Sequence, residues 1–419
     1  METALLRATT PPRGRAADDA GEPPRSSDSL EAAPAGEGAS VATTAFNMLN
    51  NLVGSGLLSI PYTFRIAGVP LGVASLVFAA SLSFTSFCFV SLLCESDRSM
   101  TTFRAMAAAG GVPRQAASWV LLLYTFGTLV SFIILSCDFV AGKGGLAPQD
   151  SVIANRWAVC ALLFVIICPS ALYGNLADLK VVSVASAAFM VAMVAVAGYF
   201  VATMDTAEPP NATSQPALFA ALRVVPVHII CFSAQINGPR FYAELQRRSP
   251  RRFAVASALA VGSALCIYLS FGLLGLRAFP DAPADLIADF PSDGVVGPAS
   301  RAMMAVVVLT TYPLLLHAMR TAFRELFTTD WPVACIALTC LVGAALPDIG
   351  VVLELKGALL GSAVVFGFTS LANVARLRAQ PEPLSAFDAR VMMVASAMLC
   401  LAVVFTLASL TVFVKKHVL

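Results

Sequence analysis

The chain has 419 residues, a formal net charge of +2, 58% apolar residues and only 12% charged residues. A soluble globular protein carries about 25% charged residues. This chain therefore cannot cover a soluble surface with polar side chains, which excludes a soluble enzyme and a nucleic-acid-binding protein. The composition indicates an all-α integral membrane protein with many spans, embedded in the lipid bilayer.

The first 40 residues differ in composition from the rest of the chain. They contain Pro11-Pro12, Pro23-Pro24 and scattered Gly and Ala, and they are net acidic. Such a segment is too poor in large apolar residues to form a packed core. We therefore predict that residues 1–40 form a disordered tail and that a transmembrane domain occupies residues 41–414.

Apolar segments long enough to cross ~30 Å of hydrocarbon follow one another after the tail. We place eleven of them, at residues 42–68, 70–94, 115–140, 156–174, 180–204, 217–245, 252–279, 296–326, 331–346, 350–376 and 389–414. The sequence therefore predicts eleven transmembrane helices.

The distribution of charged residues predicts the orientation of these helices. With a cytosolic N-terminus, the Arg-rich loop 247–252 lies inside, as the positive-inside rule requires. The acidic loop 281–293 then lies outside, as does the glycosylation acceptor Asn211 in Asn-Ala-Thr. We therefore expect a cytosolic N-terminus.

The spacing of the segments predicts an internal repeat. Segments six to ten begin at a nearly constant distance after segments one to five. Since five is an odd number, the second copy enters the membrane from the opposite face, and such an inverted 5+5 repeat is a transporter architecture. The predicted repeats cover residues 41–204 and 217–376, and 389–414 is an extra helix.

The first segment carries residues suited to an interrupted helix. Gly54 and Gly56 let the chain leave helical geometry at low cost. A helix that restarts after Gly54 presents the free N–H groups of Ser55 and Gly56, which suit a carboxylate. The helix that ends there presents carbonyls around Asn50 and Val53, which suit an ammonium group or a small cation.

The sixth segment carries a second potential break, at Gly238-Pro239, with carbonyls near Phe232 and Ser233 and a polar side chain at Gln235. Taken alone, Gly-Ser-Gly can be a packing face and Gly-Pro a simple kink. Two breaks at corresponding repeat positions favour a binding site instead. A ligand that has both a carboxylate and an ammonium group matches both helix ends, and an amino acid is the simplest such ligand.

At these residues the chain resembles the amino acid/auxin permease family over about residues 40–414. The resemblance rests on four motifs in order: the Asn-rich turn, Gly-x-Gly and Ile-Pro-Tyr of 47–68, Cys-Pro-Ser in 168–179, the closing Tyr-x-Glu-Leu of 232–245, and the Thr-x-Pro...Arg run of 309–320. It implies a LeuT-type fold with helices 1 and 6 interrupted.

The resemblance also implies an activity and a set of ligands. The family transports amino acids, often neutral ones, with sodium or protons, and it uses no cofactor other than a co-transported ion. In its sodium-coupled members, an Asn of helix 1 and a Thr of helix 8 hold sodium. By motif these residues are Asn50 and Thr311 in this chain. Thr310 is adjacent and the Val53 carbonyl is nearby, and oxygens of these kinds are ligands that such a cation needs. Alternatively, Asn50 joins two helices and the Thr311 hydroxyl bonds to its own helix.

Other positions bear on the coupling ion. Gln235 stands where many relatives have His. Lys356 lies within a span, where it pairs with Glu354, extends to the outer interface, or acts in coupling. Asp138 either makes a local hydrogen bond or relays protons. His228 lies near the second break, and we favour a hydrogen-bonded packing role for it over titration.

These observations lead to one functional hypothesis and one alternative. We expect secondary active transport of amino acids, with spans 1, 2, 6 and 7 rocking against the remainder, in the plasma membrane or a vacuolar or lysosomal membrane. The alternative is a nutrient sensor that binds an amino acid and signals through residues 1–40. No enzyme motif is found, and the sequence does not identify protein partners.

Overall fold

The computed structural model of the protein describes residues 38–142, 145–147, 150–173, 179–204, 216–346, 348–381 and 383–417. They all belong to one unit of the chain, residues 33–419. The predicted disordered tail up to residue 37 and the predicted acceptor Asn211 lie outside the described residues.

The regular structure of the described residues is helical, apart from one isolated β-bridge between Ala39 and Leu245. The helices are α1 (Val41–Leu52), η1 (Ser55–Ser59), α2 (Ile60–Ala67), α3 (Val69–Ser96), α4 (Phe103–Ala109), α5 (Arg114–Ala141), η2 (Val152–Ala154), α6 (Arg156–Tyr173), α7 (Leu179–Thr203), α8 (Ala217–Cys231), η3 (Gln235–Asn237), α9 (Gly238–Glu244), α10 (Pro250–Ala278), η4 (Leu286–Asp289), α11 (Val296–Phe327), α12 (Pro332–Ala345), α13 (Ile349–Lys356), the π-helical turns η5 (Gly357–Gly361) and η6 (Ala363–Gly367), α14 (Phe368–Arg378) and α15 (Ala386–His417).

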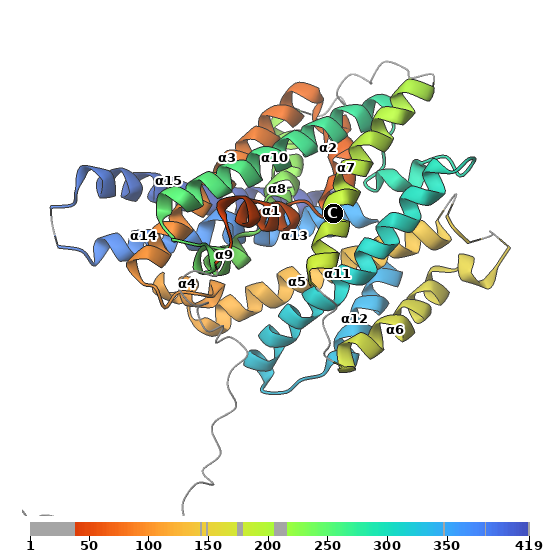
Figure 1. The fold of residues 1–419 in the computed structure, drawn as a ribbon. Coiled ribbons are helices and arrows are strands. Elements are labelled where there is room, and N and C mark those ends of the chain that lie inside the picture. Colours follow the sequence, from red (N-terminus) through yellow and green to blue (C-terminus); the bar gives the residue numbers. More distant parts are fainter. Residues whose placement is uncertain are drawn as a thin grey trace, which may run out of the picture. The chain divides into compact units, whose positions relative to one another are not determined.

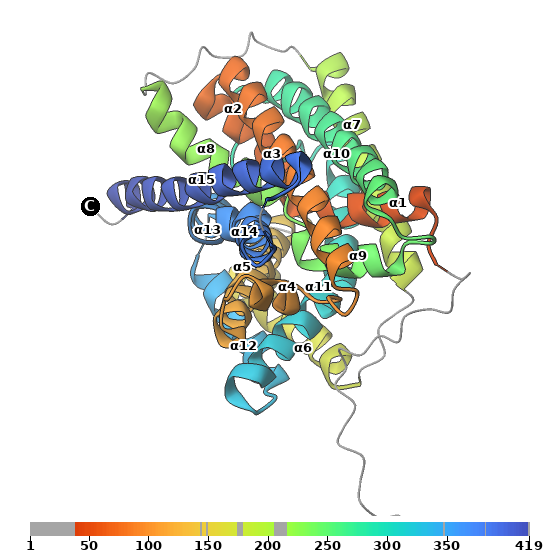
Figure 2. The same ribbon diagram turned by 90° about the vertical axis from the view of Figure 1, so that its left-hand side faces the viewer.

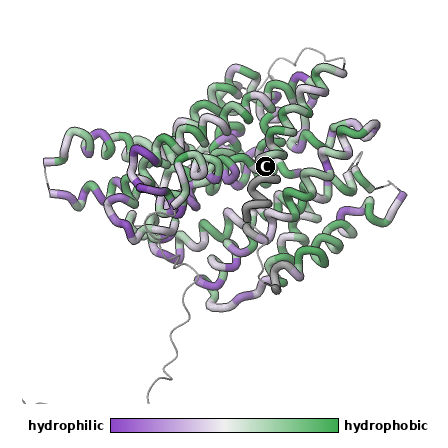
Figure 3. The backbone as a smooth tube through the Cα atoms, in the orientation of Figure 1, coloured by the Kyte–Doolittle hydropathy of each residue, from purple (hydrophilic) through white to green (hydrophobic). Residues whose placement is uncertain are grey.

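Each predicted span coincides with one helix or with a set of consecutive helices, within three residues at either end. Among the described residues, seven helices are long and apolar enough to cross a membrane, and three shorter apolar helices lie within α6, α7 and α12. Figure 3 shows apolar residues along most of the helices and polar residues mainly near their ends. The count of eleven crossings and the 5+5 repeat stay predictions.

Two pairs of long helices form much of the framework. In both ribbon views α3 lies beside α10, and α1 also packs on α10 (Figures 1 and 2). The helices α5 and α11 run side by side in Figure 1 and share the most extensive contact. Of the seven candidate spans, 217–244 and 349–378 are the most buried and α15 is the least. The interrupted segment 217–244 is therefore enclosed by other helices, whereas α15 leaves apolar side chains exposed.

Ala39, which lies within the predicted tail of residues 1–40, pairs with the segment that follows α9. The Ala39 amide donates to the Glu244 carbonyl at 2.8 Å, and the Gln246 amide donates to the Ala39 carbonyl at 2.9 Å. Such strand-like pairing depends on a segment some 200 residues further along the chain, so local composition cannot predict it. It joins the start of α1 to the end of α9.

Candidate functional site

The first interrupted helix breaks where the sequence predicts. The helix α1 ends at Leu52, and Val53 and Gly54 are extended, with φ of −88° and −138°. The chain restarts as η1. The first backbone hydrogen bond of η1 is donated by the Leu57 amide to the Gly54 carbonyl at 3.0 Å. The amides of Ser55 and Gly56 precede it and lack a partner within the helix. They form the positive end of a helix, which suits a carboxylate.

The second interruption lies earlier in the chain than predicted. The helix α8 ends at Cys231, Phe232 and Ala234 leave helical geometry, and η3 precedes α9. Gly238 is helical, with φ −54° and ψ −51°, and Pro239 occupies the first turn of α9. The prediction that Gly238-Pro239 is the break itself was wrong, because proline fits the first turn of a helix, where its missing N–H costs nothing.

The two breaks are in direct contact. A Cβ atom placed on Gly56 would lie 2.6 Å from the Cys231 Sγ, which is closer than atoms can approach, whereas one placed on Gly54 would meet no atom within 4 Å. Any side chain at position 56 would therefore displace the Cys231 sulfur at the end of α8, and Gly54 borders open space.

A tyrosine from α10 joins the same two helix ends. The Tyr268 hydroxyl lies 2.8 Å from the Leu52 carbonyl and 3.0 Å from the Cys231 carbonyl, and the residue is fully buried. One hydroxyl is thus shared between the last carbonyls of α1 and α8. This residue could not be predicted from the sequence, since a Tyr in an apolar span gives no local signal of its partners.

The carbonyls of the second break have side-chain partners in this structure. The Ser83 hydroxyl donates to the Phe232 carbonyl at 2.9 Å, and the Tyr124 hydroxyl lies 3.3 Å from the Ser233 carbonyl and 2.7 Å from the Ser233 Oγ. Each carbonyl oxygen has two lone pairs, so a second donor such as a ligand ammonium can still bind.

Gln235 is engaged by the protein itself. It is fully buried, its Nε2 donates to the Ser83 Oγ at 2.8 Å, and its Oε1 accepts from the Ala234 amide at 3.0 Å. The side chain therefore fixes the shape of the break. A direct contact between Gln235 and a ligand stays a prediction.

The predicted sodium ligands fall into two groups. The side-chain oxygen of Asn50 and the Thr311 hydroxyl are buried and have no hydrogen-bond partner in the described part of the chain. The Thr310 hydroxyl bonds to its own helix, at 2.8 Å from the Val306 carbonyl and 3.1 Å from the Val307 carbonyl. The side-chain oxygens of Asn50 and Thr311 therefore have no competing partner among the described residues, whereas the Thr310 hydroxyl already donates its hydrogen to its own helix.

Lys356 points into the helical bundle toward the second break. Its Nζ donates to the Thr128 hydroxyl at 3.1 Å and lies 5.2 Å from the centre of the Tyr124 ring. The prediction that Lys356 pairs with Glu354 or extends to the interface was wrong, because residues two apart in a helix point to nearly opposite sides. Glu354 bonds instead to Arg223, Lys416 and His417.

Asp138 and His228 are both partnered. Asp138 forms a short ion pair with Arg156, which connects α5 to the start of α6. His228 is fully buried. Its Nε2 lies 2.8 Å from the Thr63 hydroxyl, and its Nδ1 lies 2.7 Å from the Ser75 hydroxyl. The prediction of a hydrogen-bonded packing histidine is confirmed, since His228 holds α8 against α2 and α3.

The loop between α10 and α11 covers the first break. The Ser59 hydroxyl at the end of η1 donates to the Ala284 carbonyl at 2.5 Å. The next residue, Asp285, is 4% exposed; its Oδ1 accepts from the Ile287 amide, and its Oδ2 has no partner among the described residues. Burial raises the pKa of the Asp285 carboxyl well above its usual range, and the nearby charge of Asp138 adds to this.

Comparison with known proteins adds independent information. The family model described as "Transmembrane amino acid transporter protein" matches residues 37–414. Sodium-coupled neutral amino acid transporter 7 of Xenopus laevis is 26% identical, over 80% of this chain and 80% of that protein. Amino acid transporter AVT6E of Arabidopsis thaliana is 23% identical over 88% and 82%, and vacuolar amino acid transporter 5 of Schizosaccharomyces pombe is 25% identical over 68% and 69%.

Two solved structures also resemble the chain. One is the nucleobase–cation symporter Mhp1, with a TM-score of 0.48 and 13% identity, covering 91% of this chain and 94% of that chain. The other is the manganese transporter of Eremococcus coleocola, with a TM-score of 0.46 and 11% identity over 90% and 94%.

Proposed function

This chain belongs to the transmembrane amino acid transporter family, and we propose that it is a secondary active transporter of neutral amino acids that works by alternating access. One observation supports the proposal most strongly. Two helices are interrupted, and their breaks meet where Gly56 packs on Cys231. Irregular backbone inside a membrane is tolerated only when protein encloses it or when it lines a cavity, so two such breaks in contact favour a binding site.

The chemistry of the breaks supports an amino acid as substrate. The amides of Ser55 and Gly56 suit the substrate carboxylate, and the carbonyls of Val53, Phe232 and Ser233 suit its ammonium group. The break segments 53–59 and 232–237 contain no charged residue, and Lys356 adds a positive charge nearby. A substrate with a cationic side chain would be repelled, so we propose a neutral one.

The proposed arrangement in the membrane follows the distribution of charge. We place the N-terminus in the cytosol, with eleven crossings arranged as a 5+5 inverted repeat and one extra helix. The half-helices α2 and α8 then line the outer path, which leads from the outer side of the membrane to the proposed site. The half-helices α1 and α9 line the inner path, which leads from the site to the cytosol. The host membrane is the plasma membrane or a vacuolar or lysosomal membrane, and the last two fit the vacuolar name of a relative.

Two sets of side chains support the two possible coupling ions. The unpartnered oxygens of Asn50 and Thr311 are the hard ligands that sodium prefers, and the name of one relative includes sodium coupling. Lys356 and Asp138 are the candidates for proton coupling, because each is a titratable group within a span. We propose sodium first, since the side-chain oxygens of two of its predicted ligands, Asn50 and Thr311, have no competing partner among the described residues.

Transport by purified protein in proteoliposomes is the direct test. Counterflow of labelled neutral, acidic and cationic amino acids, with sodium and pH varied separately, should show uptake of neutral amino acids that rises with sodium. No counterflow of any amino acid would contradict the proposed function. Counterflow that follows the pH gradient and ignores sodium would contradict sodium coupling only.

A matched pair of variants tests the sodium ligands. Thr311→Val removes a free hydroxyl without a change of shape, and it should raise the sodium concentration needed for half-maximal uptake by about tenfold. Thr310→Val removes a hydroxyl that bonds to its own helix, so its sodium dependence should match that of the wild type. A wild-type sodium dependence of Thr311→Val would exclude Thr311 as a ligand.

A further inference from the structure

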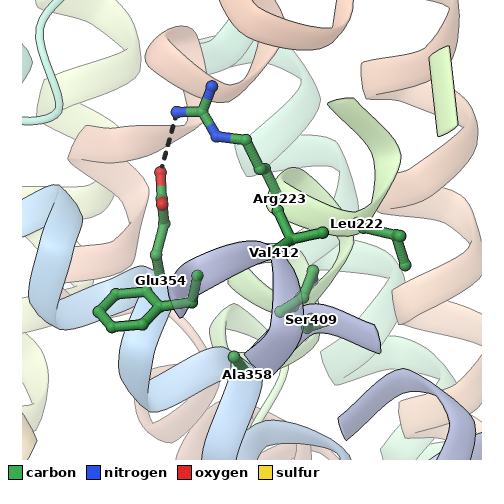
Figure 4. A pocket seen from close by; sticks show the side chains of 8 residues that line it. Leu222, Arg223, Glu354, Ala358, Ser409 and Val412 are labelled. Carbon is green, nitrogen blue, oxygen red and sulfur yellow. Dashed lines mark hydrogen bonds and ion pairs between the residues drawn. The ribbon is translucent and has the colours of Figure 1, made fainter. Parts of the chain in front are cut away.

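The Glu354 carboxylate on α13 is shared by three basic side chains. The Arg223 Nη2 lies 3.1 Å from Oε1, the Lys416 Nζ lies 3.0 Å from both oxygens, and the His417 Nε2 lies 3.3 Å from Oε2. Figure 4 shows Arg223 extended toward Glu354 above the residues of α15. The side chains of Glu354 and Arg223 are 7% and 8% exposed, so the pair is removed from solvent.

The partners of Glu354 come from parts of the protein with different proposed roles. Arg223 belongs to α8, and its Nη2 also lies 3.3 Å from the Tyr62 hydroxyl on α2. Arg223 thus connects both outer half-helices, which are expected to move, to α13. Lys416 belongs to the last turn of α15, a helix outside the predicted repeat.

The charges in this cluster do not balance. One carboxylate faces two basic side chains, Arg223 and Lys416, although a single cation suffices to neutralise it. A buried carboxylate that loses its only partner is strongly destabilised. With two cations in place, one can leave while the other keeps the carboxylate neutralised.

A small cavity lies beside the pair. It is lined by Leu222, Arg223, Pro226, Glu354, Ala358, Ser409, Val412 and Phe413. The Ser409 hydroxyl is 3% exposed and has no partner among the described residues. A cavity and an unpartnered hydroxyl of α15 therefore border the Arg223–Glu354 pair among the described residues.

We propose that Glu354 exchanges partners during the transport cycle, with Lys416 as a positioning residue that acts through Glu354. Arg223 leaves with α8 when the outer path opens, and Lys416 keeps the carboxylate neutralised until Arg223 returns. The last turn of α15 thus stabilises the open state of the outer path. This inference rests on the proposed transport function and adds to it a role for the C-terminal helix.

Lys416→Met in the full-length protein is the primary test. Arg223 still neutralises Glu354 in the closed state, so the melting temperature should not change, whereas the maximal rate of counterflow should fall about tenfold. Lys416→Arg keeps the charge and should restore most of the rate. Lys415→Met, at the exposed neighbouring position, is the matched control and should keep the wild-type rate.

The same substitution in a Glu354→Gln background separates partner exchange from a structural role. Without a carboxylate there is no charge for Lys416 to neutralise, so Lys416→Met should change the rate of the Glu354→Gln protein no further. A similar loss of rate in both backgrounds, or a wild-type rate for Lys416→Met alone, would overturn the proposal.

Hydrogen–deuterium exchange of the α8 peptide reports on opening without any substrate. Lys416→Met should slow exchange in α8 relative to the wild type, while Lys415→Met should not. If the wild-type protein moves no amino acid, the transport function fails, but this measurement still tests partner exchange. Unchanged exchange in Lys416→Met would contradict it.

Discussion

At the scale of single residues, Gly56 carries the closest contact between the two breaks. A Cβ at this position would lie 2.6 Å from the Cys231 Sγ but 3.7 Å from the Cys231 Cβ. Gly56→Ala should therefore separate η1 from α8 and reduce initial uptake by about tenfold or more. In the double variant with Cys231→Ala the obstructing sulfur is absent, so most of the uptake should return. A double variant as inactive as Gly56→Ala would show that this contact is not the cause.

Asp285 provides a residue-scale prediction of pH dependence. Burial raises the pKa of its carboxyl in the folded protein above the unfolded value of about 3.9. The folded state therefore binds more protons than the unfolded state as pH rises above about 4, and stability is lost as pH rises through the raised pKa. Asp285→Asn keeps the oxygen that caps η4 and removes the charge.

The Asp285→Asn protein should thus melt about 1–3 °C above the wild type at pH 7 and at the same temperature at pH 4. Thermal unfolding in detergent at the two pH values measures this difference. Asp293→Asn, in the exposed part of the same loop, is the control and should leave both melting temperatures unchanged. A lower melting temperature for Asp285→Asn at pH 7 would show that attraction to Arg301 outweighs burial.

At the scale of elements, Tyr268 positions the ends of two helices at once. Tyr268→Phe leaves the carbonyls of Leu52 and Cys231 without their shared donor, which costs about 1–3 kcal/mol for a buried group. The melting temperature should fall and the substrate KM should rise, because α1 and α8 end at the proposed site. Both are measured on purified protein, by thermal unfolding and by uptake at varied substrate concentration.

Tyr312→Phe is the matched control for this experiment. Tyr312 is also fully buried, and its hydroxyl lies 2.5 Å from the Thr339 hydroxyl, which joins α11 to α12 and not to a break. It should lower the melting temperature without an effect on KM. If both variants raise KM alike, the effect of Tyr268 is general destabilisation.

The elements also show what the sequence could predict. Hydropathy placed the helix boundaries, because a span needs a continuous apolar run, and Gly54 marked the first break, because glycine leaves a helix at low cost. The second break was misplaced because Pro239 starts α9. Tyr268 and the cluster around Glu354 were missed, since their contacts join segments far apart in the chain.

At the scale of the whole molecule, the N-terminal segment distinguishes a transporter from a sensor. Residues 38–40 pair with the end of α9 through Ala39, and this pairing joins the starting point of α1 to the second interrupted segment. A transporter needs that pairing to hold its inner half-helices, but it does not need the residues before it. A sensor that signals through its tail needs those residues for its output.

Two truncations separate these requirements. Removal of residues 1–36 keeps the Ala39 pairing and should leave counterflow in proteoliposomes unchanged. Removal of residues 1–40 deletes the hydrogen bonds to Glu244 and Gln246 and the Ser40 cap of α1, so counterflow should fall by about tenfold. If the chain binds an amino acid but shows no counterflow, and the shorter truncation abolishes a cellular response to that amino acid, the sensor is favoured. The transporter is favoured when only the longer truncation has an effect, because the pairing that it removes holds α1 and α9 together.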